Sequence, residues 1–239
     1  MTEEKHNSDN PIMRLFASIA ARYDCMNRVM SLGLDIAWRR SSIRDISMPD
    51  ECRILDLACG TGDFTAELVR RWPEAEIDAV DITPEMLAIA RSKLADEKSI
   101  RFLQGDAQNL RLLQSNAYSL IVCAFGFRNF PQKGNALLEC RRLLAKGGKL
   151  VVLELFRPKS KFIGTLVNVW LAVVSRIFAS GTVKEYRYLR SSVKNTVSAD
   201  EFISMAEKSG FAVCGRRFLP PAASCLAFKA IAWQTQLAE

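Results

Sequence analysis

Short apolar runs alternate with segments of helical periodicity through the middle of the chain. Five of these runs have the length and the Ile, Leu and Val content of buried strands, at residues 53–58, 76–80, 100–103, 118–124 and 149–156. Apolar residues at helical spacing fill three of the gaps, at residues 63–72, 84–94 and 133–144. Strands that alternate with helices predict an α/β fold, in which a mostly parallel sheet is covered by helices on both faces.

The two ends of the chain follow different patterns. Residues 1–10 are polar and predict a disordered tail, and residues 11–48 predict two or three short helices before the first strand. After residue 157 the alternation loosens into an apolar stretch at 162–180, a helix at 199–209 and strand-like runs within 211–233. We expect one domain over residues 11–239, with an antiparallel edge at its C-terminal end and an insertion at 157–198 that covers the substrate.

The strongest local signal is the segment Leu55 to Asp63, which joins the first strand to the first helix. Its glycines, Gly60 and Gly62, allow a ligand to approach the backbone closely because they have no Cβ atom. The third glycine of the dinucleotide pattern is missing, which disfavours NAD or FAD. A helix N-terminus attracts a carboxylate, so the methionine end of S-adenosylmethionine (SAM) fits this turn.

Two acidic positions follow at the ends of the next strands. Asp81 ends the second strand, where a carboxylate can accept hydrogen bonds from ribose hydroxyls. Asp106 and Ala107 follow the third strand. In order and spacing, the three elements resemble the class I SAM-dependent methyltransferases. That resemblance implies a Rossmann-like, seven-stranded sheet and a SAM site formed by Asp56, Cys59, Gly60, Thr61, Gly62, Asp81, Ile82, Asp106, Ala107 and Ala124.

Four further segments resemble one family within that class, the ubiquinone/menaquinone biosynthesis C-methyltransferases. They are Tyr23–Ser31 with Trp38, Phe125–Asn129, Arg142–Glu154 and Tyr186–Ser192. The chain departs from the family pattern at Asp35, where histidine is usual, and at Ala124, where serine is usual. The resemblance implies methyl transfer from SAM to a ring carbon of a prenylated hydroquinone, with demethylmenaquinol as the expected substrate.

This chemistry requires a ring hydroxyl to lose its proton, and nearby positive charge lowers the pKa of a phenol. By resemblance, Arg128 is the first candidate to hold the phenolate or to orient a water molecule, and Asn129 can hydrogen-bond the same oxygen. Tyr23 and Asp24 are the second candidates. Two structural interpretations stay open: Arg128 can tie two loops together, and Tyr23 can pack in the core.

Composition narrows the choice of partners. Lys and Arg number 33 against 26 Asp and Glu, a net charge of +7 that favours an anionic partner or reflects a basic surface without a specific role. The stretch 162–180 contains Asn168 and Arg176, so we read it as an amphipathic helix, in the core or at a membrane surface, and not as a membrane span. A lipid substrate and basic charge favour peripheral contact with an anionic membrane.

Other functions remain open or are disfavoured by the residues. The single histidine, His6, lies in the tail, so we expect no metal site, and seven unpaired cysteines without a signal peptide favour a cytoplasmic protein. The chain lacks the segments typical of nucleic-acid methyltransferases, so we expect no nucleic acid partner. A methyltransferase of another phenol or lipid, and a non-catalytic SAM-binding subunit, are the alternatives. Family resemblance alone suggests a homodimer.

Overall fold

A seven-stranded sheet forms the centre of the computed structural model, with strand order β3-β2-β1-β4-β5-β7-β6. The structure describes residues 11–49, 51–157, 165, 169, 191–192, 195–220 and 223–231. The predicted tail and nearly all of the predicted apolar helix at 162–180 lie outside the described residues. The class I methyltransferase fold predicted from the sequence is confirmed.

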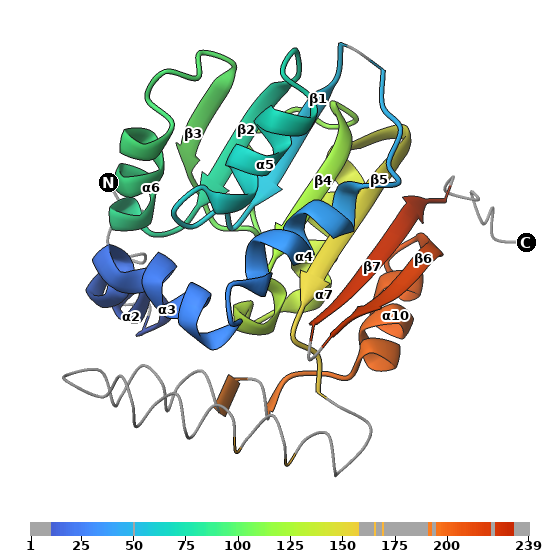
Figure 1. Ribbon diagram of the computed structural model, residues 1–239. Coiled ribbons are helices and arrows are strands. Elements are labelled where there is room, and N and C mark those ends of the chain that lie inside the picture. The colour runs from blue at the N-terminus through green and yellow to red at the C-terminus, as the bar shows by residue number, and fades with distance from the viewer. Residues whose placement is uncertain are drawn as a thin grey trace, which may run out of the picture.

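The strands are β1 (Arg53–Leu57), β2 (Glu76–Asp81), β3 (Ile100–Gln104), β4 (Tyr118–Ala124), β5 (Leu144–Glu154), β6 (Phe211–Leu219) and β7 (Ala223–Ala230). The first five are parallel, and β7 pairs antiparallel with β5 and β6. The predicted antiparallel edge is therefore present. Because β1 lies between β2 and β4, the chain leaves β1 in one direction across the sheet and later returns to its other side (Figure 1).

Alternate residues of the central strands enter two separate cores. Leu55, Leu57 and their neighbours pack against α7 (Lys133–Leu143) and α10 (Ala199–Lys208). Ile54 and its neighbours pack against α4 (Leu34–Ile43) and α5 (Asp63–Arg71) on the other face. The strands are buried on both faces, which is why they read as apolar runs with little alternation.

The N-terminal residues form α2 (Pro11–Ile19), the short 3-10 helix η1 (Ala20–Arg22) and α3 (Tyr23–Met30). These elements pack beside α6 (Pro84–Lys93) through Ile19, Ala20, Met26 and Met86. In Figure 1 they lie below α6, near the end of the sheet where the parallel strands terminate. The predicted group of short helices therefore lies beside the carboxyl ends of the parallel strands.

Several predicted boundaries differ from the structure by one or more residues, and two of these differences have a clear cause. β1 ends one residue early because Ala58 has a φ of 57°, a left-handed conformation that a strand cannot continue. β5 begins at Leu144 instead of residue 149, because Leu144 pairs with Tyr118 before a bulge shifts the register. Among the described residues, no helix is both long and apolar enough to cross a membrane.

Candidate active site

The carboxyl ends of β1 and β4 turn sharply beside each other. Ala58 follows β1 with a φ of 57°, and Phe125 follows β4 with a φ of 59°. Left-handed conformations are costly for residues other than glycine and cluster at functional sites. In open α/β sheets, ligands bind where the strand order reverses, which here is the gap between β1 and β4.

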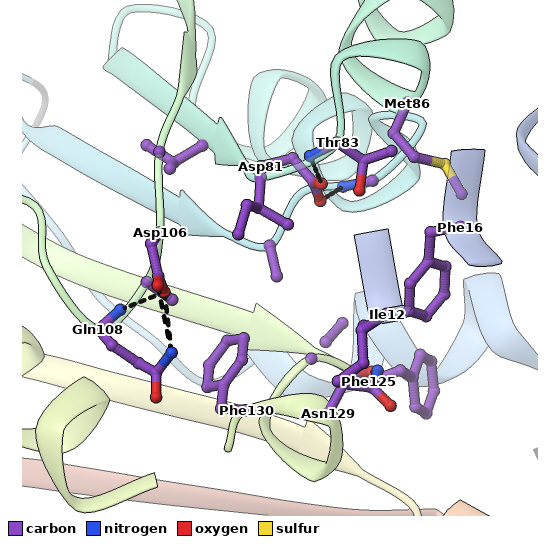
Figure 2. A pocket seen from close by; sticks show the side chains of 18 of the residues that line it. Ile12, Phe16, Asp81, Thr83, Met86, Asp106, Gln108, Phe125, Asn129 and Phe130 are labelled. Atoms are coloured by element: carbon purple, nitrogen blue, oxygen red, sulfur yellow. Dashed lines mark hydrogen bonds between the residues drawn. The ribbon is translucent and has the colours of Figure 1, made fainter. Parts of the chain in front are cut away.

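A cavity opens at this point, with about 730 Å³ of empty space including the part open to solvent. Figure 2 shows acidic side chains on one side of it, with aromatic and aliphatic side chains from α2, from α6 and from the residues that flank η2 (Phe127–Asn129) around the rest. It is lined by Ile12, Phe16, Tyr23, Ala58, Gly60, Val80, Asp81, Ile82, Thr83, Met86, Gly105, Asp106, Ala107, Gln108, Ala124, Phe125, Gly126, Asn129, Phe130 and Pro131.

Asp81 binds two backbone turns at once. One of its carboxylate oxygens, Oδ2, accepts a hydrogen bond from the Gly60 N–H at 2.8 Å, and Oδ1 accepts one from the Thr83 N–H at 2.8 Å. Burial raises the pKa of Asp81, and these N–H groups oppose that shift. A carboxylate has about four lone-pair positions, so two remain for hydroxyl groups of a ligand in the cavity.

The arrangement fits SAM on three counts. Gly60 lines the cavity with a φ of 56°, and the nearest atom to the position of a Cβ there is 3.7 Å away, so a ligand can approach this backbone closely. Asp81 offers acceptors for ribose hydroxyls. Beyond Asp81, the cavity continues between Ile82 and Met86 on one side and Asp106 and Ala107 on the other, which suits a flat, largely apolar ring.

Asp106 is fixed by its neighbour Gln108. Its Oδ1 atom accepts hydrogen bonds from the Gln108 backbone N–H at 2.9 Å and from the Gln108 side chain at 3.1 Å. Figure 2 shows this pair on the opposite side of the cavity from Met86 and Phe16. The side chain of Gln108 was not predicted as part of the site, because an amide next to an acidic turn carries no pattern of its own.

Asp24 binds the glycine turn from outside the cavity. Its carboxylate accepts hydrogen bonds from the Thr61 hydroxyl at 2.5 Å and from the Lys93 ammonium at 2.6 Å. Lys93 also binds Asp63 at 2.8 Å, and Asp63 binds Arg28. Burial raises the pKa of Asp63, but the hydrogen bonds from Lys93 and Arg28 outweigh it, so the pKa is lowered.

The same network explains Asp35, at which the chain departs from the family pattern. Asp35 is buried and forms ion pairs with both Arg28 and Arg39, and the Ser31 hydroxyl donates to it at 3.0 Å. Asp35 therefore continues the charge network that joins α3 and α4 to the start of α5. Nothing in this arrangement places its side chain at the cavity.

We expect Lys93→Met to make the N-terminal helices open more readily. It removes the ion pairs that join α6 to α3, through Asp24, and to α5, through Asp63. A partly exposed pair contributes about 1 kcal/mol, so SAM should dissociate about fivefold faster, and the effect should shrink at high salt. Stopped-flow release of SAM measures this, with Lys98→Met as the exposed control. Equal release rates for the wild type and Lys93→Met would contradict this role.

Asp56 lies within β1 and does not line the cavity. It is buried, and its Oδ2 atom accepts a hydrogen bond from the Thr65 hydroxyl at 2.6 Å. Burial raises the pKa of Asp56 to about 7. Its carboxyl group is therefore protonated in the folded state over a pH range in which it ionises in the unfolded chain.

The raised pKa of Asp56 predicts how the free energy of unfolding depends on pH. Because the folded pKa of Asp56 is raised, the folded state retains a proton that the unfolded state loses, and stability falls as pH rises from about 4 to about 7. The cost is at most about 4 kcal/mol. We expect Asp56→Asn to gain stability over the wild type at pH 8 but not at pH 4. Urea unfolding at both values tests this, and a mutant effect that does not change with pH would disprove it.

Tyr23 and Asn129 both line the cavity. Burial raises the pKa of Tyr23, although the charges of Arg128 and Arg39 and a hydrogen bond from Asn27 oppose the shift. The phenol is therefore neutral at pH 7 and acts as a donor, not a base. The Asn129 amide donates to the Phe125 carbonyl at 3.3 Å, which directs this side chain at the strained turn after β4.

Arg128 is buried in an ion pair with Glu154, at the end of β5. Its Nη1 atom donates to Glu154 at 2.7 Å and to the Phe125 carbonyl at 2.7 Å, and its backbone N–H donates to Glu154 at 3.0 Å. The side chains are 6% and 1% exposed. These contacts tie η2 to β5, which matches the structural interpretation left open for Arg128.

A second cavity adjoins the first. Ile12, Asn129, Phe130 and Pro131 line both cavities. The second cavity is further lined by Arg128, Lys133, Ser191, Ser192, Asn195 and Thr196. Its polar residues come from η2, from the first residue of α7 and from the segment before α10.

The structure thus divides the predicted site residues into two groups. Those that line the main cavity are Tyr23, Gly60, Asp81, Ile82, Asp106, Ala107, Ala124 and Asn129. Those that do not are Asp24, Asp56, Cys59, Thr61, Gly62 and Arg128. Ile12, Phe16 and Met86 were not predicted, although the i, i+4 spacing of Ile12 and Phe16 could have shown that they share a helix face. Among the described residues, no group of His, Cys, Asp or Glu is arranged to hold a metal ion.

Comparison with known proteins gives three consistent findings. Residues 1–226 match the model of the ubiE/COQ5 methyltransferase family. The chain is 40% identical over 206 residues to the demethylmenaquinone methyltransferase of Thermotoga maritima, covering 84% of this chain and 88% of the relative. It is 41% identical over 213 residues to that of Deinococcus radiodurans, covering 87% and 88%.

The fold is similar to that of a SAM-dependent methyltransferase from Aquifex aeolicus. The TM-score is 0.63 at 15% sequence identity, and the match covers 86% of this chain and 98% of the other. At this identity the likeness concerns the fold, which agrees with the strand order and with the position of the cavity.

Proposed function

Because the chain belongs to the ubiE/COQ5 methyltransferase family, we propose that it methylates a ring carbon of a prenylated hydroquinone, with demethylmenaquinol as the substrate. The chain is a SAM-dependent methyltransferase of quinone biosynthesis. The observation that best supports the specific reaction is the pair of adjoining cavities, one suited to SAM and one lined by polar groups beside it.

When bound, SAM would supply an electrophilic methyl group for a nucleophilic ring carbon. The chain's contribution is position and charge. Gly60 and Asp81 hold the cofactor at the ends of β1 and β2. Tyr23 and Asn129 stand across the cavity, where each can donate a hydrogen bond to an acceptor oxygen.

The acceptor needs its ring hydroxyl ionised, because the phenolate pushes electron density onto the adjacent carbon. The hydroxyl proton leaves to solvent. After methyl transfer the ring carbon loses its own hydrogen to solvent as a proton, and the oxygen takes one proton back, so that one proton is released overall. Asp24 is poorly suited as the base, since its carboxylate accepts hydrogen bonds from Lys93 and Thr61 and does not line the cavity. Arg128 shares its charge with Glu154, so we assign it to positioning η2 and Asn129.

Because the proposed substrate is a lipid, we also propose where in the cell the enzyme works. Peripheral contact with the inner face of an anionic membrane would bring the enzyme to its substrate, and sedimentation with anionic liposomes at low salt tests it.

A homodimer is the proposed assembly, and light scattering tests it. No feature of the cavity suits a nucleic acid partner.

Methyl transfer from labelled SAM to demethylmenaquinol, in detergent and under reducing conditions, tests the proposal. The ubiquinone-pathway benzoquinol and an unprenylated naphthol serve as competing acceptors. We expect labelled product from demethylmenaquinol in preference to both. Preference for the unprenylated phenol would point to a different small-molecule methyltransferase. SAM binding without product from any acceptor would point to a non-catalytic subunit.

A further inference from the structure

Lys133 is a cation at a helix N-terminus, where positive charge is destabilising. It is the first residue of α7, and the first turn of this helix contains no acidic residue. Helix N-termini carry partial positive charge, so a lysine there destabilises the helix where an acid would stabilise it. The ammonium is half-buried, and it donates to the Phe130 carbonyl at 3.0 Å. It forms no ion pair with a described carboxylate.

The surroundings of Lys133 point to a ligand. It lines the second cavity together with Arg128 and Asn129, and Asn129, Phe130 and Pro131 separate this cavity from the one suited to SAM. Figure 2 shows Ile12, Asn129 and Phe130 at one end of the main cavity, and these residues belong to both cavities. A group bound beside Lys133 therefore lies next to the methyl-transfer site.

The charges around Lys133 leave its ammonium available. Among the residues that the structure describes, the charged groups near it are Arg128, which lines the same cavity, and Glu154, and these two neutralise each other in a buried ion pair. Burial lowers the pKa of Lys133, and the Glu154 charge opposes that shift. An anionic oxygen beside Lys133 would offset the effect of this burial on the pKa, because an opposite charge favours the charged form of the lysine.

We propose that Lys133 binds the ring oxygen of the acceptor in the second cavity and stabilises it as the phenolate. This inference rests on the proposed function, since it names the cation that the reaction needs. The hydroxyl O–H bond breaks, its proton goes to solvent, and the oxygen anion pairs with the Lys133 ammonium. Methyl transfer to the neighbouring carbon and loss of that carbon's proton to solvent restore the aromatic ring as a phenolate, which takes up one proton from solvent to become a hydroxyl again.

The test compares Lys133→Met with Lys133→Arg and with Lys146→Met, an exposed lysine in the first part of β5. With demethylmenaquinol as substrate, we expect kcat/KM of Lys133→Met at pH 7 to fall about ten- to hundredfold. The acidic limb of its pH profile should move up by about one to three units. Lys133→Arg should regain most of the activity, and SAM affinity should not change. An unaltered pH profile in Lys133→Met overturns the proposal.

A second readout does not need turnover. 1-Naphthol reports its own ionisation by absorbance, and we expect it to ionise at lower pH when bound to the wild type than when free. That shift should be lost in Lys133→Met and kept in Lys146→Met. If no quinol is methylated but the shift depends on Lys133, the proposed function fails while the phenolate site stands. If the wild type produces no shift, or Lys133→Met keeps it, the phenolate site is refuted.

Discussion

We expect Asp81→Asn to weaken SAM binding about a hundredfold, because two hydrogen bonds that contribute about 1.5–3 kcal/mol each with a charged acceptor fall to about 1 kcal/mol each with a neutral one. The carboxylate accepts N–H groups from both Gly60 and Thr83, and its remaining lone pairs face the cavity. An asparagine amide has only one acceptor oxygen, so its NH₂ group faces one of these N–H donors. The side chain then can no longer accept hydrogen bonds from both the turn after β1 and the turn after β2.

Titration calorimetry with SAM measures this effect. Asp96→Asn, in the exposed segment between α6 and β3, is the matched control and should bind SAM as the wild type does. Circular dichroism separates lost binding from lost folding. If Asp81→Asn keeps wild-type affinity, the cavity at the ends of β1 and β2 is not where SAM binds.

Arg128→Met destabilises the fold by about 3–5 kcal/mol, because it leaves the Glu154 carboxylate buried without its ion-pair partner. The double variant Arg128→Met with Glu154→Gln removes that charge and should regain most of the loss. Activity should stay at least about tenfold below that of the wild type in both variants. The reason is that methionine cannot bind the Phe125 carbonyl, and the η2 turn that positions Asn129 loosens.

Urea unfolding and methyl-transfer rates on the same samples separate the two roles of Arg128. Glu154→Gln alone is the reference for the effect of the carboxylate. Recovery of activity together with stability in the double variant would contradict the positioning role and leave only a contribution to folding.

Local sequence patterns were enough to predict most of the sheet. β1, β2 and β4 are short apolar runs because both of their faces are buried, so the pattern can be recognised without knowledge of the neighbouring strands. The start of β5 was missed because Leu144 becomes a strand residue by pairing with Tyr118, which is distant in sequence. The end of β1 was missed because the conformation of Ala58 is imposed by the turn.

The candidate site was predictable to the extent that it follows strand ends. Gly60, Asp81 and Asp106 were found because the carboxyl ends of parallel strands meet at one edge. The partners of Asp24 and Arg128 were not predictable, since Lys93 and Glu154 are brought to them only by the tertiary fold. Lys133 was not singled out, because one lysine at the start of a helix looks like ordinary surface charge.

Carbon methylation of a prenylated quinol is the central claim, and mass spectrometry of the product formed from demethylmenaquinol and SAM with a deuterated methyl group tests it most directly. The predicted product carries the deuterated methyl on a ring carbon, next to a hydroxyl that still exchanges its hydrogen with solvent. A product with the methyl on oxygen, or no labelled product from an enzyme that binds SAM, would contradict the claim.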